Sequence, residues 1–258
     1  MLGYGPPERL DDSAGAGQGG PDDRGTDQPL TAGSGDSGQH DLGCPPMSNF
    51  PLADEFFLIN HNDLTGRPLI RRDLLGLGLV VALLAELIVE GRVGIREGRV
   101  IVLDKASHGD DASDFIITGL AAQWSNYPVR TWTDNLDDTA YELVARRLVE
   151  RGTVQRGRTR RLFGPRKDVF LPAKREAVQP LLLLDSAIKN PEEADVQRAL
   201  LITMVAATGA EHVLASLPDR DRVRTAVTEL SASLSAELTE LVAGFEEAIT
   251  ARLLSIRR

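Results

Sequence analysis

The amino-acid sequence predicts a mainly α-helical fold: one compact helical domain with two or more short β-hairpins, preceded by a disordered N-terminal tail. Three observations support this fold class. Apolar residues recur at helical spacing over most of residues 49–258. One shorter stretch alternates in polarity around a glycine, as hairpins do, and a second repeats its order of helix, glycine, strand, turn and strand. Residues 1–48 are rich in glycine, proline, serine and aspartate and show no apolar periodicity.

The N-terminal stretch also carries most of the net charge. Residues 1–50 hold eight acidic residues against Arg9 and Arg24, in a chain whose net charge is −9. Such a segment cannot bury enough apolar surface to offset the conformational entropy that ordering removes. We therefore expect a disordered tail over residues 1–48 and a helical domain over residues 49–258. Met47 lies at this boundary, so whether translation starts at Met1 or Met47 stays open.

The first segments of the domain centre on an unusually apolar stretch. A short apolar helix is predicted in PLADEFFLINHN, with Pro51 near its start. The twelve residues Leu74–Ala85 then carry no polar side chain, but Glu86 ends the run before it reaches the ~20 residues that span a bilayer. We expect a central, buried helix from about Ile70 to Glu90 in a soluble fold, with the glycines of its GLG sequence allowing close helix packing.

The elements after this helix alternate between hairpins and helices. RVGIREGRVIVLD predicts a β-hairpin around Glu97 and Gly98. DASDFIITGLAAQWSN predicts a helix capped by Asp111 or Ser113. DDTAYELVARRLVERG predicts a helix with Tyr141 on its apolar face. A second hairpin is predicted over about Thr153–Leu171, and the last helical patterns lie near residues 174–188, 191–216, 218–231 and 235–256.

The sequence offers little for catalysis. Its histidines lie on separate segments without metal-ligand spacing, and no phosphate-binding or nucleophile motif is present. The acidic run HGDDASD (residues 108–114) favours a solvated turn with helix N-terminal acids over a cation site. Trp124 and Trp132 favour packing over ligand stacking. The single cysteine, Cys44, indicates a reducing compartment. We expect no enzymatic activity, no cofactor and no metal.

The strongest anomaly in the sequence is basic. Between Arg146 and Arg175 there are eleven basic residues, opposed only by Glu150 and Asp168. Within the second predicted hairpin these basic residues alternate with apolar ones, a composition suited to an anionic membrane surface. A solvated loop with an oligomer contact, and phosphate binding on a nucleic acid, remain as alternatives; the acidic remainder of the domain disfavours nucleic acid.

The order of these segments resembles the Golgi phosphoprotein 3 family. The resemblance is carried by LADEFFLINHNDLTGRPL, LLAELIVEGRV, TW at residues 131–132, and LVARRLVERGTV, followed by a hairpin and terminal helices. It covers roughly residues 49–258, and the composition is like that of the bacterial branch. The resemblance implies a non-catalytic peripheral membrane protein. Its eukaryotic members bind phosphatidylinositol 4-phosphate and retain glycosyltransferases by their tails, and its late hairpin serves oligomerisation and membrane contact.

The headgroup pocket that the resemblance implies is not kept in this chain. In an ungapped alignment on the glycine joints, the pocket tryptophan falls at Arg71, and the three pocket arginines fall at Val80, Asp138 and Tyr141. Guanidinium groups bind phosphate through bidentate, charge-assisted hydrogen bonds, so their loss removes the basis for specificity toward phosphatidylinositol 4-phosphate.

These observations single out two groups of residues. For binding of anionic lipid they are Arg71, Arg72, Arg156, Arg158, Arg160, Arg161, Arg166 and Lys167. For membrane contact or homo-oligomerisation through the hairpin they are Leu162, Phe163, Val169, Phe170 and Leu171. We expect a cytoplasmic protein, bound peripherally to an anionic phospholipid membrane and recruiting an unknown protein partner. The alternative is a winged-helix-like nucleic-acid-binding module, with helix AYELVARRLVERG as the recognition helix.

Overall fold

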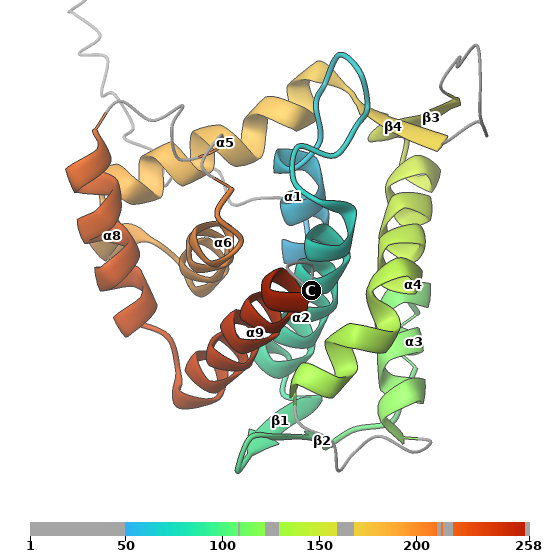
Figure 1. Cartoon of the computed structure of the whole chain (residues 1–258), viewed down its shortest axis with the longest axis vertical. Coiled ribbons are helices and arrows are strands. Elements are labelled where there is room, and N and C mark those ends of the chain that lie inside the picture. The colour runs from blue at the N-terminus through green and yellow to red at the C-terminus, as the bar shows by residue number, and fades with distance from the viewer. Residues whose placement is uncertain are drawn as a thin grey trace, which may run out of the picture. The chain divides into compact units, whose positions relative to one another are not determined.

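A computed structural model describes most of the domain (Figure 1). The described residues are 50–107, 109–121, 129–158, 168–210, 213 and 219–255, without the side chains of 129–135. The predicted tail (residues 1–48, with Cys44 and Met47), His108, Trp124 and the side chain of Trp132 lie outside them.

The predicted mainly α fold with two short antiparallel hairpins is confirmed. The elements in chain order are α1 (Leu52–Ile59), α2 (Arg72–Val89), β1 (Val93–Arg96), β2 (Arg99–Val102), α3 (Asp111–Gly119), α4 (Val129–Glu150), β3 (Val154–Arg158), β4 (Asp168–Pro172), α5 (Lys174–Lys189), the 3₁₀ turn η2 (Pro191–Glu193), α6 (Val196–Ala207), α8 (Arg220–Ala232) and α9 (Ala236–Ser255).

Helix α2 is the axis of the fold. Every residue from Leu74 to Ala85 is buried, and the helix packs against α1, α3, α4 and α9. Figure 1 shows it between α1, α4 and α9 near the centre of the domain. Because neighbours cover all its sides, the helix has no polar face, and the prediction of a buried central helix is confirmed. Within the described residues, no helix combines the length and the apolar character needed to cross a membrane.

Two glycines let neighbouring helices approach α2 closely. A Cβ atom on Gly76 would lie 2.5 Å from the backbone oxygen of Asp137 in α4, and one on Gly78 would overlap the ring of Phe56 in α1. The predicted role of the GLG sequence in close helix packing is therefore confirmed. The cost in helix propensity, about 1 kcal/mol for each glycine, is offset by these contacts.

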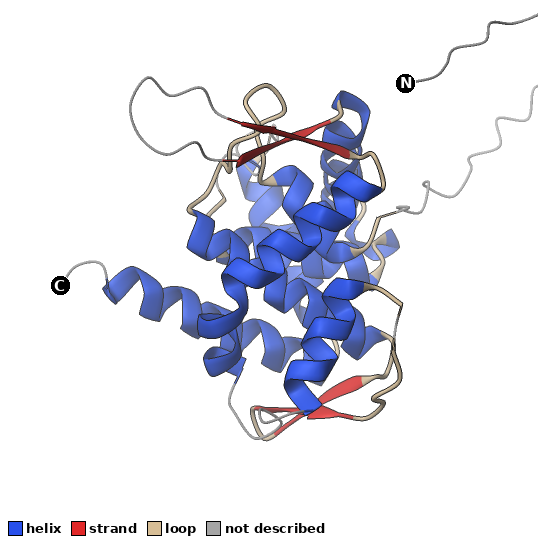
Figure 2. Cartoon of the chain, turned by 90° about the vertical axis from the view of Figure 1, so that its right-hand side faces the viewer, coloured by secondary structure: helices blue, strands red, loops and turns tan. Residues whose placement is uncertain are grey.

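The two hairpins lie at opposite ends of the helical body (Figure 2). Strands β1 and β2 pair with Arg96 opposite Arg99, and the turn residues Glu97 and Gly98 both have positive φ, as a tight two-residue hairpin turn requires. Strands β3 and β4 pair from Val154 opposite Pro172 to Arg158 opposite Asp168. Both hairpins follow a helix that ends at a glycine with positive φ, Gly91 or Gly152.

Three boundaries differ from those predicted. The cap of α3 is Asp110, whose side chain accepts the backbone N–H of Ser113, so neither Asp111 nor Ser113 is the cap. Helix α4 begins earlier, at Val129. The pattern predicted over residues 191–216 divides into η2 and α6, because Asp195 caps a new helix by accepting the N–H of Arg198.

The close packing at Gly76 leads to a stability prediction. Gly76→Ala should lower the free energy of unfolding by about 1–3 kcal/mol, because the added methyl group meets backbone that cannot move aside. The matched control is Gly119→Ala in α3, where no described atom beyond the helix's own neighbouring residues lies within 4 Å of the new Cβ; it should be neutral or slightly stabilising. Chemical denaturation measures both, and equal effects would contradict the packing role.

Candidate functional site

The basic hairpin β3–β4 is anchored to the domain by its apolar side chains. Val154 and Phe170 are almost fully buried, and the ring of Phe170 meets that of Tyr141 edge-on at a centroid distance of 5.8 Å. Val169 is 9% exposed, and Leu171 packs near Gly157 and Gly66. Phe170 therefore faces the core, whereas Val169 and Leu171, on the other side of the strand, pack at Gly157 of β3, and Leu171 is partly exposed.

The arginines of β3 lie on the surface of the same hairpin. The side chains of Arg156 and Arg158 are 57% and 72% exposed, and both approach Asp168 of β4. The hydrogen bond from Arg156 lowers the pKa of Asp168. Two guanidinium groups thus share one carboxylate, so the described part of the hairpin keeps a positive charge. The other predicted hairpin residues, Arg160, Arg161, Leu162, Phe163, Arg166 and Lys167, lie outside the described residues.

Arg71 and Arg72 lie at the start of α2 among acids, and Arg72 is near the hairpin, because its contacts Tyr141 and Glu142 also lie beside Phe170 and Arg156. Arg71 donates from Nε to Asp73 Oδ1 at 3.0 Å. Arg72 pairs with Glu142 at 2.7 Å and stacks on the ring of Tyr141, with its Cζ 3.7 Å from the ring centroid. These carboxylates neutralise both guanidinium groups and occupy part of their donors, which weakens their attraction for an anionic ligand.

The positions aligned with the family's headgroup pocket do not form a basic pocket here. Val80 is completely buried within α2, and Asp138 is an exposed acid. Tyr141 is 1% exposed and its hydroxyl lies 2.9 Å from Nε2 of His61. Since Nδ1 of His61 contacts the carbonyl oxygen of Phe57, which can only accept, Nδ1 carries the proton and Nε2 accepts from Tyr141. Burial lowers the pKa of His61 to about 4, which keeps this pair neutral.

Part of the basic run is structural, because α4 uses its arginines to hold other helices. Arg147, whose side chain is 8% exposed, donates from Nε to Asp54 of α1 at 2.9 Å and from Nη1 to Asp110 at 2.8 Å. Arg151 contacts the second oxygen of Asp54 at 2.7 Å. Arg146 pairs with Asp111 at the surface. The run therefore divides into an internal network on α4 and an exposed group on the hairpin.

The same network accounts for the acidic run before α3. Asp110 caps α3 and binds Arg147, and Asp111 pairs with Arg146. Asp114 accepts a hydrogen bond from the hydroxyl of Ser107 at 2.5 Å. No group of three or more metal-ligating side chains is found among the described residues. The interpretation of these acids as turn and cap residues is consistent with this arrangement, although His108 is not described.

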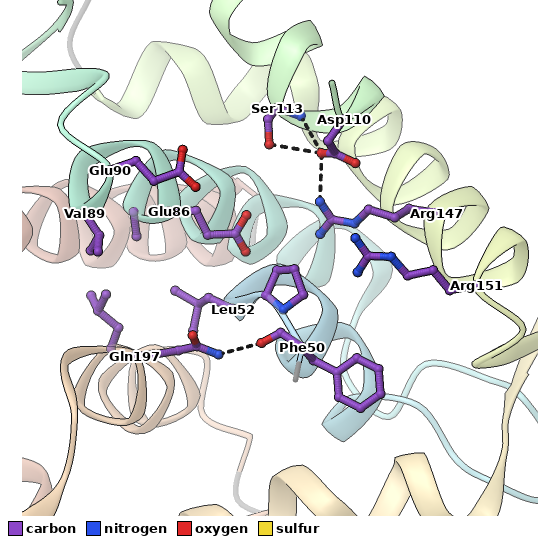
Figure 3. Close-up of a pocket in the computed structure, with 13 residues that line it drawn as sticks. Phe50, Leu52, Glu86, Val89, Glu90, Asp110, Ser113, Arg147, Arg151 and Gln197 are labelled. Atoms are coloured by element: carbon purple, nitrogen blue, oxygen red, sulfur yellow. Dashed lines mark hydrogen bonds and ion pairs between the residues drawn. The ribbon is translucent and has the colours of Figure 1, made fainter. Parts of the chain in front are cut away.

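A cavity of about 390 Å³ opens beside this network (Figure 3). It is lined by Phe50, Pro51, Leu52, Ala85, Glu86, Val89, Glu90, Asp110, Ser113, Arg147, Arg151, Gln197 and Leu200. Glu86 and Arg147 enter it from α2 and α4. Pro51 has no side-chain donor or acceptor with which to cap α1, and Glu86 replaces such a cap by accepting the N–H of Ala53 at 2.7 Å. Burial raises the pKa of Glu86 to about 7.

The sequence analysis missed the residues of this network. Asp54 and Glu55 are fully buried in an otherwise apolar helix, and their partners Arg147 and Arg198 come from α4 and α6. Two adjacent acids inside an apolar helix are the signal that could have revealed them, since buried carboxylates need a counter-charge. Which arginines provide it depends on contacts across more than ninety residues, which the sequence pattern does not contain.

The comparison with family models gives one match. Residues 52–250 match the family described as Golgi phosphoprotein 3 (GPP34). The match begins at the first residue of α1 and ends within α9, so it spans both hairpins. No curated protein matches the chain.

The buried network predicts a large difference between two neighbouring arginines. Arg147→Met should lower the free energy of unfolding by about 3–5 kcal/mol, because it leaves the buried Asp54 with only the partly exposed Arg151. The control Arg146→Met removes an exposed pair and should cost about 1 kcal/mol or less. Similar losses for both variants, measured by urea denaturation, would contradict the structural role of Arg147.

Glu86 predicts a pH dependence of stability. Its folded pKa of about 7 lies above the ordinary 4.5, so folding favours the protonated form, and stability present below pH 4.5 is lost as the pH rises through 7. The loss amounts to about 3 kcal/mol. Glu86→Gln removes this pH dependence, because glutamine does not ionise. The unfolding free energy of the variant relative to the native chain should therefore rise across this range, whereas a pH-independent difference would contradict the account.

Proposed function

Because the chain belongs to the Golgi phosphoprotein 3 family, we propose that it is a non-catalytic adaptor that binds an anionic membrane surface through the β3–β4 hairpin and recruits a protein partner there. The family resemblance supports this role, since it implies a peripheral membrane adaptor without catalytic activity. The proposed partner is a protein, and the proposed lipid is an anionic phospholipid.

The observation that carries the proposal is the charge and position of the hairpin. Between Val154 and Asp168 the chain has six basic residues and one acidic residue. The hairpin lies at one end of the helical body, and its arginines Arg156 and Arg158 are exposed while its apolar residues hold it to the core. Each basic residue near an anionic membrane contributes about 1 kcal/mol, so several together give reversible binding.

The remaining predicted residues have lesser roles in the proposed membrane binding. Arg160, Arg161, Arg166 and Lys167 add charge next to β3 and β4, and Leu162 and Phe163 supply apolar side chains for insertion or for contact between two copies. Arg71 and Arg72 contribute less, because Asp73 and Glu142 already neutralise them. We accordingly propose a general preference for anionic lipid rather than recognition of one phosphoinositide.

The nucleic-acid alternative fits the geometry less well. A winged-helix interpretation would place α4 in a DNA groove, but its apolar face is buried against α2 and its Arg147 is bound to Asp54. The side chains that α4 exposes along its C-terminal half include three acids, Asp138, Glu142 and Glu150, and the single base Arg146. This acidic surface would repel phosphate.

Flotation with vesicles tests the proposal by comparing charge reversals in the two hairpins. The native chain should bind phosphatidylcholine vesicles more strongly as phosphatidylserine is added, and binding should weaken with salt. Arg156→Glu combined with Arg158→Glu should weaken binding about tenfold or more, and extending the reversal to Arg160 and Arg161 should abolish it.

The control reverses the same number of charges on the other hairpin. Arg96→Glu with Arg99→Glu changes two exposed arginines of β1 and β2 at the far end of the domain, and should leave binding within about twofold. Thermal melts check that each variant is folded. Binding that ignores the phosphatidylserine content, or that falls equally in both pairs of variants, would refute the proposal. Tight DNA binding with a steep salt dependence would favour the alternative.

A further inference from the structure

An exposed apolar surface lies beside the basic hairpin. Leu64 and Leu69, both in the α1–α2 loop, are 74% and 43% exposed. On α5, Val178 and Leu182 are 46% and 63% exposed and lie one helical turn apart. Exposed leucines are common singly, but these four apolar residues lie on two segments that adjoin across one recess, lined by Leu69 and Val178, and they are called the apolar patch below.

Backbone hydrogen bonds and chain connectivity place the parts of this surface together. Gly66 accepts the backbone N–H of Phe170 at 3.0 Å, so the loop is fastened to β4. A recess of about 260 Å³ separates the loop from α5 and is lined by Leu69 on one side and Val178 on the other. Helix α5 itself begins directly after β4, at Lys174. The hairpin, the loop and α5 therefore form one continuous surface at this end of the domain.

Leu64 is held outward by a well-ordered turn. The side-chain oxygen of Asn62 accepts the backbone N–H groups of Leu64 and Thr65 at 3.1 and 2.8 Å. The main chain closes the loop with hydrogen bonds from Gly66 to Asn62 and from Asn62 to Arg67, at 2.8 and 2.9 Å. Because these hydrogen bonds already fix the loop, less conformational entropy is lost when Leu64 leaves water for an apolar environment.

The charges around the patch select an anionic surface. Arg67 is exposed in the loop, and Lys174 and Arg175 are exposed at the start of α5, next to the hairpin. Asp63 is the exposed acid of the loop. Apolar side chains rimmed by bases suit the boundary between lipid headgroups and acyl chains, where the apolar groups enter and the bases stay at the phosphates.

From this arrangement we infer that the loop residues Leu64 and Leu69 and the α5 residues Val178 and Leu182 form a second membrane-inserting surface, which enters an anionic bilayer together with the hairpin. The inference rests on the proposed function and adds to it the orientation of the domain: α5 lies along the membrane, and the β1–β2 hairpin points away from it (Figure 1). The hairpin provides attraction through charge, and this patch provides attachment through apolar contact.

Site-directed labelling tests this orientation on the full chain. In a Cys44→Ser background, Leu64→Cys or Leu182→Cys is labelled with an environment-sensitive fluorophore and mixed with phosphatidylserine-containing vesicles. Both labels should shift to the blue and be quenched by lipids that carry a quencher on the acyl chain. The control is Leu103→Cys, which follows β2 and is 55% exposed; its label should not respond.

An affinity measurement complements the labels. Leu64→Ser with Leu182→Ser should weaken vesicle binding about tenfold, whereas Leu103→Ser with Val89→Ser, which removes two comparably exposed side chains at the opposite end, should change it less than about twofold. If the native chain binds and the hairpin reversals weaken it, but the labels stay silent and both serine pairs behave alike, this inference fails while the proposed function stands. The native chain could instead form a dimer in the absence of vesicles. If Leu64→Ser with Leu182→Ser dissociates that dimer, the inference is overturned in favour of self-association.

Discussion

The buried carboxylates of α1 are the constraint on which the arrangement of the other helices depends. Asp54 binds Arg147 of α4 and Arg151, which directly follows α4, and Glu55 binds Arg198 of α6 at 2.7 Å. An unpaired charge at either position would cost several kcal/mol, so alternative packings of α4 or α6 against α1 are penalised. Apolar burial supplies most of the stability of such a core, and these ion pairs select which packing is adopted.

This constraint also connects the core to the end of the domain that carries the basic hairpin. Helix α4 leads directly into β3 through Gly152, so fixing Arg147 and Arg151 on Asp54 fixes the place from which the basic hairpin leaves the body. The arginines of one basic run thus have two different tasks. Arg147 is neutralised inside the protein and, with Arg151, positions the hairpin on Asp54, whereas Arg156 and Arg158 of β3 stay exposed beside Asp168.

Much of the fold could be predicted from local pattern, and much of the site could not. The central helix, the hairpin turn at Glu97 and Gly98 and the packing glycines follow from periodicity and from the preferences of glycine, and these expectations are confirmed. The cap at Asp110 was missed because Asp111 and Ser113 fit the same local rule. The involvement of Arg72 with Glu142 and of Arg147 with Asp54 depends on long-range contacts. Charge counting therefore overstated how many of these arginines are open to a ligand.

The central claim is that one end of the domain, formed by the β3–β4 hairpin with the α1–α2 loop and α5, faces an anionic membrane. Hydrogen exchange followed by mass spectrometry, with and without phosphatidylserine vesicles, measures this directly. The account predicts slower exchange at residues 153–173 and 62–69 on membrane binding, with no change at residues 93–103. Protection centred on residues 93–103, or protection spread evenly along the chain, would contradict it.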